Sequence, residues 1–215
     1  MKKIKGVIFD LDGVIVSTDD FHYKAWKQLA NREGIYFDRI INNKLRGISR
    51  RESLEIILEK GHKKYSKLKI DEMLKFKNNI YKESLKKLTK YNILDGFNEL
   101  YMKLQEINMK MAIGSSSKNA KRILKQIELI DSFDAIVDGT DITHSKPNPE
   151  VFLLAAKRLE LKTVECVVIE DALAGIKAAK AGNMMAIAIG DAKQSELADY
   201  RINNLLEIFE ILKRE

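Results

Sequence analysis

Short apolar runs alternate with helix-patterned segments along most of the chain, and this alternation constrains the fold more than any other feature. Short, mostly apolar runs of this kind are typical of parallel strands buried on both faces. Five runs are predicted strands: Lys5–Phe9, Met111–Gly114, Ala135–Val137, Cys166–Ile169 and Met185–Ile189. Five segments are predicted helices: Phe97–Ile107, Lys118–Ile127, Pro149–Leu159, Ala172–Ala181 and Ile202–Leu212. The order predicts an α/β fold with a doubly wound, Rossmann-like parallel sheet.

The stretch from Val16 to Lys90 interrupts this order after the first strand. It carries about four helical patterns and no convincing strand. We therefore expect a helical cap domain inserted into the sheet domain. The predicted division is residues 1–15 and 92–215 for the α/β core and residues 16–91 for the cap. The chain would cross between them near Val14–Thr18 and Lys90–Asp95.

Composition and charge narrow the function classes. With 45% hydrophobic and 32% charged residues in 215, the chain can bury a core, and no apolar run approaches the ~18 residues of a membrane span. The net charge is +7, and residues 16–90 hold 19 Lys and Arg against 10 Asp and Glu. A solvated lysine-rich helical surface is favoured over a nucleic-acid-binding face, because the segment has no nucleic-acid module. An attraction for phosphates is still expected.

The compartment is predicted from the first residues and the single cysteine. The apolar stretch Val7–Phe9 near the start is too short for the hydrophobic region of a signal peptide. Cys166 is the one cysteine and lies in the apolar run CVVI, where a buried, inert thiol is expected. A reducing cytoplasm fits this cysteine usage.

Pairs of acidic residues follow two of the predicted strands. Asp10 and Asp12 come directly after the first strand, with Gly13 behind them, and their spacing projects both carboxylates to one side. Solvated acids in a turn would also fit these residues. Glu170 and Asp171 end another strand, and parallel strands place such ends at a common crevice. Four carboxylates gathered there would repel one another unless a cation is present, which predicts a metal site.

Two further strand ends carry groups suited to an anion. Gly114–Asn119, a serine-rich stretch, opens a predicted helix, although an ordinary helix cap would look the same. Ser145–Pro149 places Lys146 before another helix, although a loop lysine is usually only solvated. Together these ends favour metal-assisted phosphoryl transfer through an aspartate nucleophile, and hard oxygen ligands favour Mg²⁺. The three histidines, His22, His62 and His144, have no zinc-type spacing. The sequence also has no Walker glycine-lysine loop.

The four segments at these strand ends resemble the motifs of the haloacid dehalogenase-like superfamily in order and spacing: DLDG, SSSKN, SKPNP and IEDALAGIKAAKAG. Three segments of the cap resemble the β-phosphoglucomutase family within it: STDDFHYKAW, LRGISRRESL and FKNN. The resemblance implies interconversion of β-D-glucose 1-phosphate and glucose 6-phosphate. The reaction would pass through an aspartyl-phosphate enzyme and a β-glucose 1,6-bisphosphate.

Carried over to this sequence, the resemblance implies that Asp10 is the nucleophile and Asp12 the general acid and base. Asp12 must exchange a proton although an aspartate pKa is ordinarily ~3.9, so a desolvated, closed site should raise its pKa. The implied Mg²⁺ ligands are the Asp10 side chain, the Asp12 carbonyl, Glu170 and Asp171. Closure of the cap is therefore expected to be required for the chemistry.

The resemblance also assigns the groups that hold phosphates. Ser115 and Lys146 would offset charge on the transferring phosphoryl group. Arg50 from the cap would hold the other phosphate together with Ser117 and Asn119 from the core. Arginine suits this task because it can contact a phosphate with two donors.

Four more residues match positions of the cap and hinge that contact substrate in the relatives. These are Thr18, His22, Lys77 and Gly47, of which the glycine allows close approach of the backbone. For His22, beside Trp26, a structural role would explain the residues equally well. Arg51, next to Arg50, is expected to be solvated.

The sequence departs from the family pattern at three places. Ala172 stands where a serine commonly follows the Glu-Asp pair, which removes one hydrogen bond near the predicted metal. Ser116 replaces a more usual alanine, and Ile35–Asn43 follows the pattern loosely. These departures bear on the substrate more than on the chemistry.

Two alternatives to a mutase stay open on the sequence. A magnesium-dependent sugar-phosphate phosphatase would use the same core residues, with water attacking the aspartyl-phosphate. A non-catalytic binding protein would use only the basic cap. We expect an enzyme that binds small hexose phosphates as a monomer, without nucleic acid or membrane as a partner.

Overall fold

A single sheet forms the centre of the protein. The computed structural model describes residues 3–61 and 63–214, so His62 and positions 1, 2, 62 and 215 of the predicted domains lie outside the described residues. Within the described residues the strands are β1 (Gly6–Phe9), β2 (Lys110–Gly114), β3 (Ala135–Val137), β4 (Cys166–Glu170), β5 (Met185–Ala188) and β6 (Tyr200–Arg201). They form a parallel sheet of order β3-β2-β1-β4-β5-β6. The predicted doubly wound parallel sheet is confirmed.

The order of the strands decides where a site can lie. β1 is central and pairs with β2 on one side and β4 on the other, with Phe9 opposite Ile113 and Ile169. The chain therefore reverses its direction of travel across the sheet between β1 and β4. Ligands of such sheets bind beyond the carboxyl ends of the strands at this reversal. Asp10 follows β1, and Glu170 is the last residue of β4, so both lie at this place.

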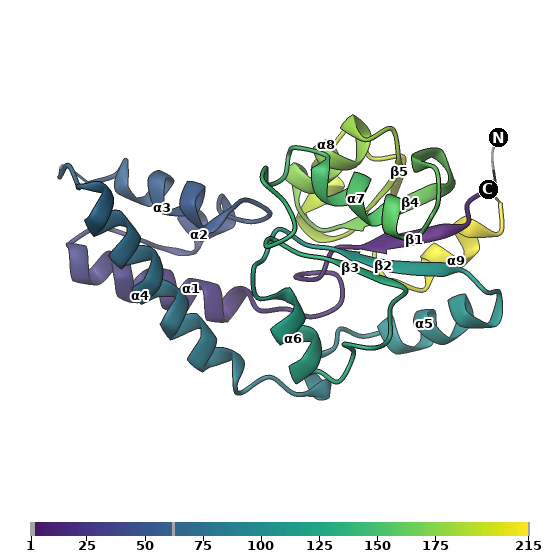
Figure 1. The fold of residues 1–215 in the computed structure, drawn as a ribbon, viewed down its shortest axis with the longest axis horizontal. Helices are drawn as coiled ribbons and strands as arrows, with labels where there is room; N and C mark the ends of the chain where they lie inside the picture. Colours follow the sequence, from purple (N-terminus) through teal and green to yellow (C-terminus); the bar gives the residue numbers. More distant parts are fainter. Residues whose placement is uncertain (1–2, 62, 215) are drawn as a thin grey trace.

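Helices cover both faces of the sheet (Figure 1). Alternate residues of β1 face opposite sides, because side chains of a strand alternate. Val7 and Phe9 pack with α5 (Phe97–Glu106), α6 (Ala120–Gln126) and α9 (Glu207–Leu212). Ile8 packs with α7 (Glu150–Arg158) and α8 (Leu173–Ala181). These two apolar layers bury the strands and hold their ends in place.

The basic segment folds into helices that extend away from the sheet (Figure 1): α1 (Asp19–Glu33), α2 (Arg39–Asn43), α3 (Arg50–Leu58) and α4 (Lys67–Leu85). They enclose an apolar cluster of their own, which includes Trp26, Leu54 and Met73. Tyr81 and Leu85 of α4 instead join the cluster beneath the sheet. A separate cluster supports our proposal that residues 16–91 form a cap and residues 1–15 and 92–215 a core.

The two chain crossings between sheet and helices lie beside each other. Val16 forms one bridge with Asp12 and another with Ile93. The backbone N–H of Leu94 donates to the carbonyl of Ile15 at 2.8 Å. The outgoing and returning strands of chain are thus tied together.

At the C-terminal end one predicted boundary is wrong and one strand was not predicted. β6 was not expected, because Tyr200–Arg201 is too short to show a strand pattern. The last helix begins at Glu207 rather than Ile202, because the Glu207 carboxylate accepts the backbone N–H groups of Asn203 and Asn204 and ends the loop there. Ile202 is nevertheless buried against the sheet.

Cys166 is fully buried in the described structure, as predicted. Burial raises the pKa of its thiol to about 12, and the neighbouring Glu165 charge adds to the rise. Among the described residues, no helix is both long and apolar enough to cross a bilayer.

Candidate active site

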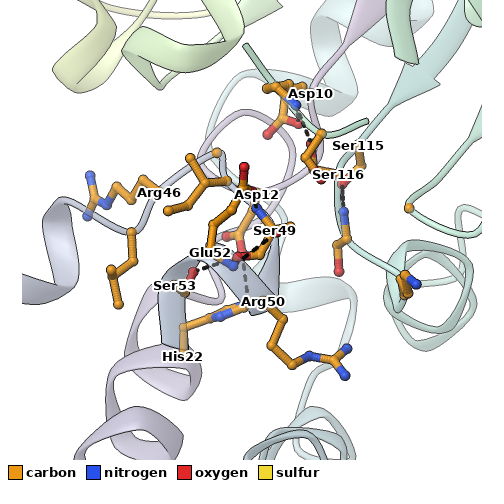
Figure 2. A pocket seen from close by; sticks show the side chains of 18 of the residues that line it. Asp10, Asp12, His22, Arg46, Ser49, Arg50, Glu52, Ser53, Ser115 and Ser116 are labelled. Atoms are coloured by element: carbon orange, nitrogen blue, oxygen red, sulfur yellow. Dashed lines mark hydrogen bonds and ion pairs between the residues drawn. The ribbon is translucent and has the colours of Figure 1, made fainter. Parts of the chain in front are cut away.

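A cavity of about 1260 Å³ lies between the carboxyl end of the sheet and the helices α1–α4. Its lining includes Asp10, Asp12, Ser115 and Lys146 from the core and Arg50 from the cap. In Figure 2, Asp10, Ser115 and Ser116 lie to one side of Asp12, and Ser49, Arg50 and His22 lie to the other. The cavity therefore joins the strand ends to the cap. Further residues predicted for the site also line it: His22, Gly47, Lys77, Ser117, Asn119 and Asp171.

Three carboxylates meet at one end of this cavity. Oxygens of Asp10, Glu170 and Asp171 all lie within 4.8 Å of one another. Two glycines leave the room for them. A Cβ on Gly175 would lie 2.0 Å from the Glu170 carboxyl carbon, and a Cβ on Gly13 would lie 2.0 Å from an Asp171 oxygen.

The charges of this acidic cluster, Asp10, Glu170 and Asp171, oppose its assembly. Burial raises the pKa of Asp171 well above its usual range, and the charges of Glu170 and Asp10 raise it further. Burial and the Asp10 charge likewise raise the pKa of Glu170 to about 7, although Lys146 offsets part of this. Buried like charges are stabilised by a cation, and an all-oxygen donor set suits a hard divalent ion. The residues present therefore fit a divalent metal.

Lys146 reaches the same cluster from the loop before α7. Its Nζ donates to Asp10 Oδ1 at 2.6 Å and to Glu170 Oε2 at 2.7 Å, and the residue is fully buried. Burial alone would lower the pKa of Lys146, but the two carboxylates outweigh it and hold the pKa above its ordinary value. Asp171 makes no such contact with Lys146 and, like Asp10, lines the cavity.

Glu170 is also held from the other side. The backbone N–H of Ala172 donates to Glu170 Oε1 at 3.1 Å. Ala172 itself brings no hydroxyl, so the departure from the family pattern leaves this backbone contact as the support that residue 172 gives to the carboxylate.

Asp12 is oriented by the chain that leaves the sheet. The Thr18 N–H donates to Asp12 Oδ1 at 2.7 Å, and the Thr18 hydroxyl donates to Asp12 Oδ2. The Tyr81 hydroxyl lies 2.8 Å from the Thr18 oxygen and completes the chain of hydrogen bonds. Burial raises the pKa of Asp12 to about 6, although the two bonds from Thr18 act in the opposite direction. A carboxyl with this pKa can take and return a proton near neutral pH.

His22 and Lys77 form a pair beside Asp12. Lys77 Nζ lies 2.9 Å from His22 Nδ1 and over the rings of Trp26 and Tyr81. His22 Nε2 lies 3.9 Å from Asp12 Oδ2. Burial lowers the pKa of Lys77 well below its usual range, and the charge of Arg50 lowers it further. Burial and the Lys77 charge likewise lower the pKa of His22.

The serine-rich stretch forms a compact turn after β2. The Ser115 hydroxyl accepts the N–H of Ser117 at 3.2 Å, and the Ser117 hydroxyl accepts the N–H of Asn119 at 3.2 Å. Ser116 Oγ lies at 3.5 Å from the Lys146 N–H that points to it. The Asn119 side chain donates to Asn78 Oδ1 of α4 at 3.1 Å. This last bond joins the core to the cap.

Arg50 begins α3 at the cap side of the cavity. Ser49 caps this helix, since its side chain accepts the N–H of Glu52 and its own N–H donates to the Glu52 side chain. Arg50 makes no ion pair with any residue in the described part of the chain, and burial lowers its pKa. Arg51 instead contacts Glu55 and Asp71 and is 45% exposed, as expected of a solvated side chain.

The loop before α3 touches the core. Gly47 has a φ of +77°, and a Cβ there would lie 3.1 Å from the Ala172 Cβ. Arg46 donates to Asp191 of the core at 2.7 Å. The Gly47 backbone thus lies against the side chain of Ala172, next to Asp171.

Sequence reasoning missed four of the groups described here. Tyr81 could have been found, because it lies four residues after Lys77 and shares its helix face. Arg46, Asp191 and Asn78 act through contacts between cap and core that no local pattern predicts.

Comparison with known proteins shows the family to which the chain belongs. A family model described as haloacid dehalogenase-like hydrolase matches residues 7–189. The chain belongs to the haloacid dehalogenase-like hydrolase family. The resemblance inferred from the motifs is therefore confirmed, and the DLDG and IEDALAG segments lie inside the matched range.

Individual members of the family differ in how much they share with this chain. A β-phosphoglucomutase from Bacillus subtilis (strain 168) is 41% identical over 99% of this chain and 95% of its own length. A crystal structure of β-phosphoglucomutase from Clostridium difficile has a TM-score of 0.91 and 38% identity, covering 98% of each chain. A phosphorylated carbohydrates phosphatase from Thermotoga maritima is 29% identical over 84% of this chain and 82% of its own.

Proposed function

We propose that this protein is a phosphomutase that interconverts β-D-glucose 1-phosphate and glucose 6-phosphate. The reaction passes through phospho-Asp10 and a β-glucose 1,6-bisphosphate. The observation that carries the proposal is that one cavity is lined by two sets of residues suited to hold a phosphate. Asp10, Asp171, Ser115 and Lys146 form one set, together with the proposed metal, and Arg50 with Ser117 and Asn119 forms the other.

Two sets distinguish a mutase from a simple hydrolase. A bisphosphate carries one phosphate that is transferred and one that must be held while the transfer occurs. Arg50 lines the cavity and has no acidic partner within residues 3–61 and 63–214, so its guanidinium is available to a second phosphate. The similarity to the Bacillus and Clostridium β-phosphoglucomutases over nearly the whole chain supports the same assignment.

The chain's own residues divide the chemistry. Asp10 holds the phosphoryl group as an acyl phosphate and gives it to a sugar hydroxyl, while the Asp12 carboxylate takes the proton of that hydroxyl. In the reverse transfer the Asp12 carboxyl returns the proton to the leaving sugar oxygen. Thr18 keeps Asp12 aimed at this place through two hydrogen bonds. Ser115 and Lys146 offset negative charge on the phosphoryl oxygens during both transfers.

The proposed metal is Mg²⁺, held by the side chains of Asp10, Glu170 and Asp171 and by the Asp12 carbonyl. When bound, it neutralises charge on the transferring phosphoryl group. The all-oxygen set of donors favours Mg²⁺ over a softer ion.

The phosphatase remains the second candidate, because the acidic cluster and Lys146 would serve it equally. The test compares two rates on the same enzyme with Mg²⁺. One is formation of glucose 6-phosphate from β-D-glucose 1-phosphate with a trace of the bisphosphate, and the other is release of free phosphate from a panel of sugar phosphates. We expect the mutase rate to exceed phosphate release by about 10²-fold or more. Faster phosphate release from every sugar phosphate would instead show a phosphatase.

Two variants sharpen this comparison. Asp10→Asn should abolish both rates, because no nucleophile remains. Arg50→Ala should lower the mutase rate and spare the release of phosphate from small esters, because such esters have no second phosphate. A variant Arg50→Ala with unchanged mutase kcat/KM would contradict the assignment of this residue. Equal sugar-phosphate binding by Asp10→Asn and wild type, with no turnover by either, would favour a non-catalytic binding protein.

We further propose that the substrates are small hexose phosphates and that the enzyme works as a monomer in the cytoplasm. The cavity of about 1260 Å³ between cap and core suits a small molecule rather than a polymer. The single buried thiol suits a reducing compartment.

A further inference from the structure

Arg46 of the cap makes an ion pair with the core that the proposed mechanism does not use. Its Nη1 donates to Asp191 Oδ2 at 2.7 Å, across 145 positions of sequence. On its other side, Nε and Nη2 lie 3.4 Å from the two Asp19 carboxylate oxygens. Arg46 therefore lies between two carboxylates, one from each side of the cavity mouth.

The cap orients this guanidinium before it meets the core. Asp19 is the first residue of α1, and its carboxylate also accepts the side-chain N–H of Asn42 at 2.9 Å. Asn42 is 2% exposed, so it is held firmly by its surroundings. A carboxylate braced in this way fixes the plane of the guanidinium that it pairs with.

The core partner lies next to the acidic cluster. Asp191 belongs to the 3₁₀ turn Gly190–Gln194, in which the Ala192 N–H donates to the Asp171 carbonyl at 2.8 Å. A Cβ on Gly190 would lie 3.7 Å from the Asp171 Cβ. An ion pair to Asp191 therefore closes the cap directly beside Asp171.

A second contact of the same loop points to the same place. The Arg46–Gly47 backbone approaches α8 so closely that a Cβ at Gly47 would lie 3.1 Å from Ala172 and 3.5 Å from Ala174. The small residues of both partners permit this approach, and the ion pair lies at its edge. The loop 44–49 then leads into Ser49 and Arg50 at the start of α3.

We propose that Arg46 and Asp191 form an ionic latch that holds the cap loop 44–49 against the core beside Asp171. Arg46 is a positioning residue in this role, because its contacts in the structure are with Asp19 and Asp191. By fixing the loop, it places Arg50 over the cavity. For its kinetic consequence the inference rests on the proposed function, whereas its conformational consequence does not.

The latch is weak enough to open in each turnover. The side chains of Arg46 and Asp191 are 31% and 56% exposed, and ion pairs with this exposure shift an equilibrium by only about 2- to 5-fold. Loss of the pair lowers the ratio of closed to open molecules by that factor. Since a substrate gripped by cap and core binds the closed form, its apparent affinity falls by up to the same factor, while kcat changes little.

The kinetic test is a double-mutant cycle. Arg46→Gln and Asp191→Asn should each raise KM for the hexose phosphate about 2- to 5-fold, and the double variant should raise it no further. Arg46→Lys should recover part of the loss. Matched controls are Lys44→Gln in the same loop and Glu196→Gln after the same turn; both side chains are exposed, and we expect wild-type KM.

Two outcomes of the cycle would overturn the latch. If Arg46 bound a substrate phosphate directly, Arg46→Gln would raise KM, but Asp191→Asn would leave it unchanged or lower it, because a nearby negative charge would be gone. Additive losses in the double variant would show that the two side chains act separately.

A scattering experiment tests the latch without any substrate. Small-angle X-ray scattering should give a larger radius of gyration for Asp191→Asn and Arg46→Gln than for wild type, Lys44→Gln and Glu196→Gln. Equal radii for all five proteins would overturn the latch even if the mutase assay succeeds. If the mutase assay fails with wild type but the radii differ as expected, the proposed function is wrong and the latch stands.

Discussion

Gly13 and Gly175 decide how closely the acids of the cluster approach one another. Each glycine lies against a different carboxylate, Asp171 and Glu170, at a distance that no side chain could share. Gly13 also has a φ of +85°, a conformation that other residues rarely adopt. The strand ends could be predicted to carry acids, but the space that lets the acids converge comes from residues on other segments.

Replacing Gly175 tests this arrangement. In Gly175→Ala the new methyl group would overlap the Glu170 carboxyl carbon, so Glu170 must move away from Lys146 and the proposed metal. We expect the Mg²⁺ concentration for half-maximal activity to rise about 10- to 100-fold, the usual scale for disturbed support of a metal ligand. A titration of activity against Mg²⁺ measures it.

Gly182→Ala is the control for this change. It lies at the end of the same helix, and a Cβ there would make only ordinary contacts, the nearest at 3.4 Å. Its Mg²⁺ requirement should equal that of wild type. An unchanged requirement in Gly175→Ala as well would mean that Glu170 takes no part in metal binding.

At the scale of helices and strands, local pattern predicted most of what is observed. The five apolar runs could be predicted as strands, because a strand buried on both faces shows as a short apolar run in the sequence itself. The edge strand Tyr200–Arg201 was not predicted, because two residues are too few to show an alternating pattern. The contact of Asn78 was missed for a different reason. Its partner Asn119 lies far away in the sequence, at the start of α6, and only folding brings it to α4.

The bond between Asn78 and Asn119 joins α4 to the turn that we propose holds the second phosphate. Asn78→Ala frees the Asn119 amide to rotate, and we expect KM to rise about 3- to 10-fold, the effect of one lost hydrogen bond. Steady-state kinetics with the hexose phosphate measure this. Asn79→Ala is the matched control, since Asn79 is adjacent and exposed. Equal KM values for the two variants would show that Asn119 needs no support from the cap.

Another ion pair fastens α7 to the loop after β3 and makes stability depend on pH. Arg158 donates to Asp141 at 2.8 Å and lowers the pKa of that carboxyl to about 2. Because the folded pKa lies below the unfolded value of about 3.9, the contribution to stability is complete above pH 4 and is lost as pH falls toward 2.

Asp141→Asn should therefore lower the free energy of unfolding by about 0.5–1 kcal/mol at pH 7 and by less at pH 3. Urea denaturation at the two pH values measures the difference. Asp131→Asn, at an exposed position, should match wild type at both. A deficit in Asp141→Asn that grows as the pH falls would contradict the sign of this shift.

At the scale of the whole molecule, the excess of positive charge and a separate apolar cluster coincide in one segment. Residues 16–90 carry 19 basic against 10 acidic residues, and Trp26, Leu54 and Met73 pack there away from the sheet. The charge could be counted in the sequence, and so could the absence of strands. How Tyr81 and Leu85 return to the cluster under the sheet could not, because the sequence does not show where α4 crosses it.

If residues 16–91 form a domain, a cavity in their cluster should loosen them alone. Leu54→Ala removes a fully buried side chain, which destabilises by about 2–5 kcal/mol. We expect faster amide hydrogen exchange in α2 and α3 and unchanged exchange in β1 and β4. Mass spectrometry of peptides after exchange measures both. Equal acceleration in β4 would mean that cap and core unfold as one unit and would contradict the proposed division.

The paired crossings at Val16 and Ile93 form a single axis between the helices α1–α4 and the sheet. Because Val16 bridges to Asp12 on one side and to Ile93 on the other, both chain crossings are joined along one line. Any rotation of α1–α4 relative to the sheet is then about that line, and unrestricted reorientation is prevented. Asp12 is itself part of this bridge, so the residue that we propose carries the proton keeps its place beside Asp10 during such a rotation.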